Sequence, residues 1–409
     1  MRIAFVSREY AGVGSGGGIG TYVRNAARML ATRGHDVEVF TEGQPAGMRA
    51  ESGIRINIAN CRATDFAEAI VPPFEAAHQA NPFDVVESAE YGADAAIVFE
   101  RFPEVARIVK LHTANFQIGA MNEAYLTLGM KARFVAGALR RGRMPKPFWN
   151  KYEPECDREL ALTLLADEIT SPSKAMLDWT SDAWPISAMA RAVIPNVFVP
   201  PAELLACVPA GRPKLVTFVG KLEVRKGVLE LAAAIPQILK AHPDARFRFV
   251  GRALLHPATR RPLDETIRHL AGSAASKSIE FTGALDYADV ASHLAESAIA
   301  VFPSYWENHP YVCLEAMAAG CAVVGSNAGG MAEMIEHGRT GMLVAPEDPA
   351  AIAQAVIELL RDDERRASMG AAARAHVLSA YSTEAIAPLQ EASYKRAIAK
   401  RQRLAEAVR

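Results

Sequence analysis

Short apolar runs, each followed by a turn and an amphipathic stretch, recur along the first half of the chain. Residues 2–7 include the run Ile-Ala-Phe-Val and predict a buried parallel strand. A glycine-rich turn over 12–20 precedes an amphipathic helix over 21–33, which Gly34 ends as its C′ residue. A second strand is predicted over 36–40. This order is typical of a parallel α/β sheet.

The same alternation begins again after residue 213. The apolar runs predict a helix over 228–240 and strands over 214–219, 246–250, 299–302 and 322–325. The segment 199–213, rich in Pro and Ala, is interpreted as a linker between the halves. We therefore predict two Rossmann-like domains, residues 1–200 and 213–384, and expect ligands at the carboxyl ends of their strands, in a cleft between the domains if they face each other.

The C-terminal stretch is predicted to be helical from about Asp348 to the end of the chain. Interruptions are expected near Tyr381 and Ser382 and at Pro388. The last helix, 385–409, either stays on the second domain or completes the first, and the sequence leaves both possibilities open.

Length and composition narrow the class of protein. A chain of 409 residues is too long for one ordinary core, which agrees with two domains. The formal net charge of −1 and the lack of binding motifs argue against a nucleic-acid partner. The five scattered cysteines form no C-x-x-C pair and indicate a reducing cytoplasm. Neither a secretory signal nor an apolar run of roughly 18 residues is found.

The glycine-rich turn follows the first strand and opens a helix, an arrangement suited to binding phosphate. Gly12, Gly14 and Gly17 formally match the dinucleotide fingerprint G-x-G-x-x-G, with Glu38 or Glu42 as the acidic residue that a ribose would need. The turn is longer than that fingerprint, so we favour contact with another phosphorylated ligand. A merely flexible loop is the remaining alternative.

Two glutamates flank the start of a helix in the second half. Glu307 lies in the loop after the strand 299–302, and Glu315 lies about a turn and a half into a helix predicted to begin near Pro310 as its N1 residue. A carboxylate accepts two hydrogen bonds and therefore suits a vicinal diol of a sugar. Taken alone, the pair is also compatible with a solvated surface.

The run Glu307-Asn-His-Pro-Tyr-Val-Cys-Leu-Glu315 resembles the paired-glutamate motif of glycosyltransferase family 4, the glycogen-synthase-like group of retaining GT-B enzymes. Six further motifs are similar to that family and occur in its order. They are Gly17-Gly18-Ile-Gly20, Gly34-His35-Asp-Val, Ile194-Pro195-Asn196, Val219-Gly220-Lys221-Leu with Lys226-Gly227, Phe281-Thr-Gly283, and Gly329-Gly330 with Glu336-His-Gly338-Arg-Thr-Gly341. The resemblance covers most of the chain and implies the GT-B fold, with two facing Rossmann-like domains.

The resemblance also implies roles for individual residues in binding a nucleotide-sugar donor. Glu315 would hold the donor ribose, and Glu307 would lie by the donor sugar. Backbone N–H groups of the loop between them would bind sugar and phosphate. That loop comprises His309, Pro310, Tyr311 and Val312.

Basic residues of the second domain would bind the diphosphate. The resemblance implies this role for Lys221 and Lys226, with Arg225 as a helper and Arg252 reaching the nucleotide. The family usually has Arg at the first position. Lys221 supplies charge there without the bidentate fork of a guanidinium group.

The first domain would contribute a glycine loop and a histidine. Gly17 and Gly18 match the family's loop, and His112, at the end of a predicted strand, matches its donor-sugar histidine. The alternative for His112 is a buried core histidine.

The reaction implied is transfer of a hexosyl group, with retention, to a glycan, lipid-linked or small-molecule acceptor. Fixed lysines and backbone dipoles suit the charge that develops on a diphosphate leaving group, so no metal and no cofactor are expected. Glu307 is a candidate for binding and electrostatic stabilisation. A sugar-nucleotide epimerase or phosphorylase on the same fold, and a non-catalytic sugar-nucleotide-binding protein, are the competing functions.

The segment 131–151 contains seven basic residues and no acidic one. Phe134, Phe148 and Trp149 lie among them. This pattern suits an anionic membrane surface or an anionic, lipid-linked acceptor, and peripheral contact with the inner face of a membrane is one interpretation. The other is a solvated loop and helix face. The basic residues are Lys131, Arg133, Arg140, Arg141, Arg143, Lys146 and Lys151.

Overall fold

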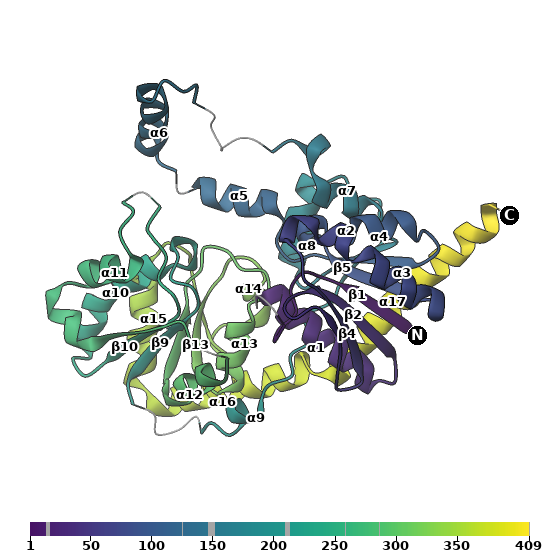
Figure 1. Ribbon diagram of the computed structural model, residues 1–409. Helices are drawn as coiled ribbons and strands as arrows, with labels where there is room; N and C mark the ends of the chain where they lie inside the picture. The colour runs from purple at the N-terminus through teal and green to yellow at the C-terminus, as the bar shows by residue number, and fades with distance from the viewer. Residues whose placement is uncertain are drawn as a thin grey trace. The chain divides into compact units, whose positions relative to one another are not determined.

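The chain forms two compact units (Figure 1). A computed structural model describes residues 1–13, 17–124, 126–145, 152–208, 213–257, 259–285 and 287–408. Unit 1 comprises Met1–Val197 together with Thr383–Arg409, and unit 2 comprises Phe198–Ser382. The C-terminal helix therefore belongs to unit 1, and the segment 199–213 is grouped with unit 2.

The described part of unit 1 is built on an eight-stranded sheet with the order β3-β4-β2-β1-β5-β6-β7-β8. Neighbouring strands are parallel except for the antiparallel pair β3 and β4. The strands are β1 Arg2–Val6, β2 Asp36–Glu42, β3 Gly47–Glu51, β4 Ile54–Ala59, β5 Val85–Ala89, β6 Ala106–Lys110, β7 Glu168–Ser171 and β8 Arg191–Val193.

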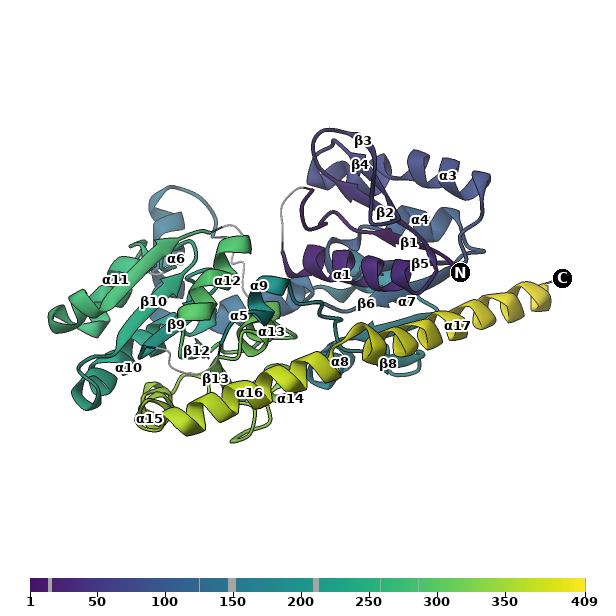
Figure 2. The ribbon, with the colours of Figure 1, turned by 90° about the horizontal axis from the view of Figure 1, so that it is seen from below.

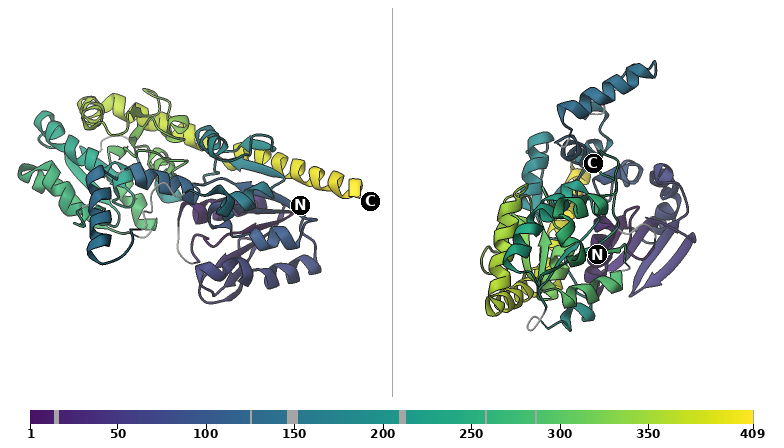
Figure 3. Two further views of the ribbon diagram at one scale, coloured as in Figure 1. Left: turned by 90° about the horizontal axis from the view of Figure 1, so that it is seen from above. Right: turned by 90° about the vertical axis from the view of Figure 1, so that its left-hand side faces the viewer.

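Helices connect these strands except for β2, β3 and β4, which follow one another directly, and α5 and α6 extend away from the sheet (Figures 1 and 3). The α-helices of unit 1 are α1 Gly18–Thr32, α2 Phe66–Ala69, α3 Val71–Ala80, α4 Ala96–Arg101, α5 Asn115–Ala124, α6 Leu128–Arg140, α7 Arg158–Leu164, α8 Lys174–Ala183 and α17 Thr383–Val408. Short 3₁₀ turns are η1 Ala63–Asp65, η2 Tyr91–Ala93 and η3 Pro154–Cys156.

The described part of unit 2 contains a six-stranded, fully parallel sheet with the order β11-β10-β9-β12-β13-β14. In chain order within the unit this is 3-2-1-4-5-6, the doubly wound arrangement. Its connections reverse direction between β9 and β12, where ligands of such sheets bind. The strands are β9 Leu215–Val219, β10 Arg246–Val250, β11 Ile279–Gly283, β12 Ile299–Phe302, β13 Ala322–Ser326 and β14 Met342–Val344.

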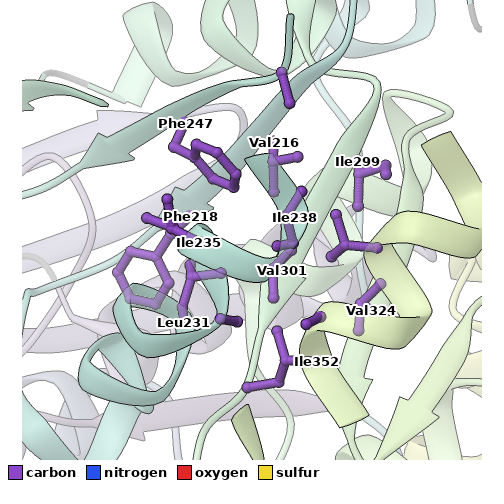
Figure 4. Packing of buried hydrophobic residues seen from close by; sticks show 14 of the residues in the cluster. Val216, Phe218, Leu231, Ile235, Ile238, Phe247, Ile299, Val301, Val324 and Ile352 are labelled. Atoms are coloured by element: carbon purple, nitrogen blue, oxygen red, sulfur yellow. The ribbon is translucent and has the colours of Figure 1, made fainter. Parts of the chain in front are cut away.

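The helices of unit 2 pack on this sheet around a buried apolar core. Val216, Phe218 and Val301 from the strands meet Leu231 and Ile235 from the first long helix (Figure 4). The helices are α9 Ala202–Leu205, α10 Val228–Ala241, α11 Leu263–Ala271, α12 Tyr287–Glu296, α13 Tyr311–Ala318, α14 Met331–Met334, α15 Pro349–Arg361 and α16 Asp363–Ala380, with 3₁₀ turns η4 Val224–Lys226 and η5 Ser273–Ser278.

The predicted strands are confirmed almost to the residue, whereas several helix ends differ. Helix α1 begins at Gly18, because the backbone N–H of Thr21 already donates to the carbonyl of Gly17 (3.0 Å). Gly34, with φ +84°, ends it as predicted. An unpredicted break separates α15 from α16, where the Asp362 carboxylate accepts from the backbone N–H of Arg365 and caps α16.

The predicted interruption at Pro388 is wrong, whereas the one near Tyr381 and Ser382 is confirmed. Helix α17 runs through Pro388. A proline removes one helical hydrogen bond, but the buried side chains of Ile386 and Ala387 hold the helix before it, and those of Gln390 and Tyr394 hold it after it.

Helix α17 lies along the sheet of unit 1 (Figure 2). A buried carboxylate of β5 fixes it there. One oxygen of Glu87 accepts a hydrogen bond from the Tyr22 hydroxyl (2.5 Å). The other accepts from the Tyr394 hydroxyl (2.7 Å) and from Nε2 of Gln390 (2.8 Å). Burial raises the pKa of Glu87, and these donors oppose that rise. Within the described ranges, no helix is long and apolar enough to cross a membrane.

Replacing Tyr394 with Phe is expected to destabilise unit 1 by about 1–3 kcal/mol, because a buried carboxylate loses a donor. Tyr10→Phe is the matched control. Tyr10 is equally buried, and its hydroxyl has no hydrogen-bond partner among the described residues, so this change is expected to cost less than about 0.5 kcal/mol. Urea unfolding of both variants measures the difference, and equal stabilities would contradict this role of Glu87.

Candidate active site

The loops after β9 and β12 lie against each other at the point where the connections of unit 2 reverse direction. The backbone N–H of Tyr305 donates to the carbonyl of Arg225 (2.9 Å). Gly227 adopts φ +69°, and a Cβ atom there would lie 2.0 Å from the carbonyl oxygen of Pro303. Only glycine fits both the backbone conformation and this close approach. The two loops are therefore held in fixed register.

An ion pair joins the same two loops. The Lys226 ammonium contacts Oε1 of Glu307, and the two side chains are 17% and 12% exposed. Burial alone would raise the pKa of Glu307. The charges of Lys226 and Arg225, with hydrogen bonds from Lys226 and Ser304, outweigh burial and hold the pKa below its usual value. Glu307 is thus kept as a carboxylate, and two residues that the sequence proposed separately are brought into contact.

The segment after β13 supports Glu307 from behind. The backbone N–H of Gly330 donates to the carbonyl of Glu307 (2.8 Å). Gly329 has φ +65°, and a Cβ atom there would lie 2.2 Å from that same carbonyl oxygen. A side chain at this position would push the Glu307 loop away, which gives the Gly329-Gly330 pair a physical function.

Helix α13 begins at Tyr311 with Pro310 as its N-cap, one residue later than predicted. Glu315 is buried in the second turn of this helix, so it is not the solvated surface residue that was the alternative. The His309 ring packs edge-on against Tyr381, with 5.1 Å between centroids. Tyr311 is buried beside Phe198, so its backbone rather than its ring is the part suited to bind a ligand.

Lys221 and Arg252 follow β9 and β10 and are both exposed. Their loops run together, since the N–H of Leu222 donates to the carbonyl of Arg252 (3.0 Å). Arg225 forms an ion pair with Glu223 (2.7 Å), so its charge is already partly neutralised. Lys226 is likewise paired with Glu307, whereas Lys221 and Arg252 form no ion pair with the described residues.

The glycine loop of unit 1 is described in part, because Gly14, Ser15 and Gly16 lie outside the described residues. Gly17 is the N-cap of α1, and a Cβ atom there would lie 2.3 Å from the Glu9 carboxylate. Gly18 faces open space, with no atom within 4 Å of the position of a Cβ. A side chain at position 17 would only displace the flexible Glu9 side chain, and the space at Gly18 leaves room for a ligand.

His112 lies just after β6 and is held through its backbone. Its N–H donates to both carboxylate oxygens of Glu90 (2.9 and 2.8 Å). Its ring packs edge-on against Tyr22, with 5.2 Å between centroids. Burial, followed by the charge of Lys110, lowers the pKa of His112 to about 3. The imidazole is therefore neutral near pH 7. His112 is buried, as the core alternative expected, and it also lies directly after a strand, as the resemblance implied.

Two buried carboxylates of unit 1 were not identified from the sequence. Burial, with an added contribution from Glu159, raises the pKa of Glu90 to about 8, although the N–H of His112 opposes this. Glu159 accepts from the backbone N–H of Gly92 and of Asn115 (2.7 Å each). Glu90 directly follows a buried strand, a signal that was available. Glu159 lies within a helix and gives no comparable signal.

A cavity of about 370 Å³ lies at the other edge of the unit 2 sheet, by the amino ends of β9, β10 and β11. Several of the charged side chains that line it pair with one another, as Arg248 does with Glu280 (3.0 Å) and Glu296 (2.7 Å). We place the candidate site at the carboxyl edge, where the ion pair and glycine contacts converge.

Two family models match most of the chain. The model described as "Glycosyl transferase 4-like domain" matches residues 17–197, and "Glycosyl transferases group 1" matches residues 213–362. Glycogen synthase of Mycobacterium tuberculosis is 26% identical, over 95% of this chain and 92% of its own. D-inositol 3-phosphate glycosyltransferase of Corynebacterium urealyticum is 25% identical, over 94% and 93%.

The fold is also found among solved structures. Sucrose-phosphate synthase from Thermosynechococcus elongatus superposes with a TM-score of 0.74 at 23% identity, over 98% of this chain and 99% of the other. At this identity the similarity concerns the fold alone.

Gly329→Ala is expected to destabilise unit 2 by roughly 2–4 kcal/mol, since it combines a left-handed backbone with a clash against the Glu307 carbonyl. Gly338→Ala is the matched control, because Gly338 has φ +79° but open space around it. That variant is expected to lose only about 1 kcal/mol. Chemical unfolding compares the two, and equal losses would mean that Gly329 does not support Glu307.

Proposed function

We propose a specific reaction for this chain, which belongs to the group 1 glycosyl transferases and takes a nucleotide sugar as its donor. Its two Rossmann-like units have the GT-B fold. In the proposed reaction a hexosyl group passes from a nucleoside-diphosphate sugar to an acceptor hydroxyl, with retention at the anomeric carbon and without a metal ion. The observation that carries this proposal is the Lys226–Glu307 pair where the loops after β9 and β12 meet.

The donor diphosphate is proposed to bind next to this pair. Lys226 is held in place by Glu307, so its ammonium group needs little reorganisation when phosphate arrives. Lys221 is exposed on the adjoining loop and supplies a second charge. Arg252, on the neighbouring loop, is proposed to contact the nucleotide.

The sugar and ribose are proposed to lie along the amino end of α13. In the loop His309, Pro310, Tyr311 and Val312, every residue except Pro310 has a backbone N–H group. These groups lie at a helix start, where the partial positive charge favours anionic groups. Glu315 is proposed to accept from the ribose hydroxyls, and Glu307 to hold the donor sugar. An ionised Glu307 can also stabilise positive charge that develops at the anomeric carbon, which is the role we assign to it.

In unit 1, Gly17 and Gly18 are proposed to contribute the glycine loop of the donor site, and His112 to contact the donor sugar. A neutral imidazole both donates and accepts one hydrogen bond, so it suits a hydroxyl better than an imidazolium would. Glu90 fixes the backbone of His112.

We propose that the reaction needs no metal ion, because protein groups can stabilise the negative charge of the departing diphosphate. Lys226, Lys221 and the backbone dipoles of α13 meet that charge, and no cofactor is invoked. The acceptor is proposed to be a glycan, lipid-linked or small-molecule hydroxyl. The relatives named for glycogen and for inositol 3-phosphate support this range. We propose a cytoplasmic location, in keeping with the five free cysteines.

A thermal-shift and donor-hydrolysis screen tests the function. Purified protein is mixed with UDP-, GDP-, ADP- and TDP-sugars, with and without EDTA. We expect one donor to raise the melting temperature and to be hydrolysed slowly, and we expect EDTA to change neither result.

A loss of both in EDTA would contradict metal independence. No shift with any donor would favour a protein that does not act on nucleotide sugars. An inverted product anomer, detected by NMR, would contradict retention.

Lys226→Ala is expected to lower turnover by about 10²-fold or more, because a fixed charge that stabilises the leaving group is lost. Lys240→Ala is the control, since Lys240 is an exposed lysine at the end of α10, outside the proposed site. Initial rates over a range of donor concentrations, up to saturation, give turnover and KM for the comparison. Near-normal turnover in Lys226→Ala would refute its role, whereas a loss confined to KM would assign it to ground-state binding alone.

A further inference from the structure

Helix α6 turns apolar side chains outward. Leu128 is 85% exposed and Leu139 is 58% exposed, and Ala132 and Val135 lie between them at helical spacing on the same face. Ala138 is the one residue of this helix that is buried. Since α6 stands away from the sheet of unit 1 (Figures 1 and 3), this apolar stripe has no covering element among the described residues.

Exposed arginines flank the apolar stripe. Arg133 and Arg140 lie on one side of it, about a third of a turn around the helix, and Arg141 and Arg143 follow at the helix end. No carboxylate of the described residues forms an ion pair with these four side chains. In the sequence, no acidic residue occurs between Glu123 and Glu153. Lys146, Phe148, Trp149 and Lys151, which also belong to the basic segment, lie outside the described residues.

We infer that α6 binds the surface of an anionic bilayer, with its axis along the membrane and its apolar stripe in the headgroup region. Its 13 residues span about 20 Å, which is too short to cross a bilayer but suitable for lying on one. Apolar residues flanked by arginines are the pattern of interfacial helices. A second copy of α6 would meet the stripe with like charge, which disfavours self-association through this face.

Membrane binding by α6 is a function separate from the proposed glycosyl transfer, because α6 contains none of the residues assigned to the donor site. Binding would keep unit 1 next to acceptors that reside in or on the membrane. The basic residues would raise affinity for anionic lipids in a salt-dependent way, and the leucines would add an apolar contribution that salt does not screen.

Co-sedimentation with vesicles tests the inference. We expect the full chain to bind vesicles of phosphatidylglycerol and phosphatidylcholine, to bind pure phosphatidylcholine poorly, and to be released by added salt. The triple variant Arg140→Glu, Arg141→Glu, Arg143→Glu is expected to bind at least about a hundredfold more weakly. Leu128→Ser with Leu139→Ser keeps the charge and is expected to bind roughly tenfold or more weakly.

The matched control changes the same amount of charge elsewhere. Lys240→Glu, Lys277→Glu, Arg361→Glu alters three exposed bases of unit 2 and is expected to bind vesicles like the wild type. Equal binding by the two triple variants, or no binding by the wild type, would overturn the inference. A dimer on size-exclusion chromatography that the leucine substitutions abolish would assign the stripe to a second copy instead.

Donor hydrolysis without vesicles separates this inference from the proposed function. The α6 variants are expected to hydrolyse the donor at the wild-type rate, because their substitutions lie on α6 or just after it and outside the proposed donor site. Loss of vesicle binding with intact hydrolysis therefore concerns the membrane surface alone. Absent hydrolysis in the wild type with intact vesicle binding would count against the proposed function and leave the membrane inference standing.

Discussion

The ion pair of Lys226 with Glu307 joins two loops that are far apart in the sequence but adjacent at the carboxyl edge of the unit 2 sheet. This ion pair positions the two side chains but adds little to the free energy of folding, because the cost of desolvating partly buried charges offsets most of their attraction. Burial would raise the pKa of Glu307, but the charges of Lys226 and Arg225 hold that pKa below its usual value, so Glu307 stays a carboxylate at low exposure. The pair therefore holds an ammonium group and a carboxylate ready for a ligand of mixed charge, and much of the surrounding structure serves to keep both loops in place.

Unit 1 uses buried carboxylates for a related purpose. Glu87 accepts hydrogen bonds from Tyr22 of α1 and Tyr394 of α17, and these bonds fix the C-terminal helix to the sheet. Glu90 accepts the backbone N–H of His112 and fixes the loop after β6. A carboxylate has four acceptor positions and can tie together segments that share no other contact. The loss of solvation that this requires is visible as the raised pKa of both groups.

The sequence predicted strands better than it predicted helix ends or support residues. The run 299–302 is continuous and apolar, and the observed β12 has those bounds. Pro388 was expected to break a helix by a local rule, but the burial of Gln390 and Tyr394 overrides that rule. The support that Glu159 gives to two loops depends on tertiary contacts between distant segments, and one sequence contains no sign of such contacts.

Three glycines of unit 2 allow its loops to pack closely against one another. A Cβ atom on Gly227, Gly251 or Gly329 would lie 2.0, 1.9 or 2.2 Å from a backbone carbonyl oxygen of a neighbouring loop. All three follow strands at the carboxyl edge, and all three have positive φ. They allow backbone to press on backbone, which leaves the loops little freedom to shift. In the proposed reaction this rigidity would keep Lys226 and Glu307 in place while charge develops, so we propose that the glycines act through rigidity rather than through contact with the ligand.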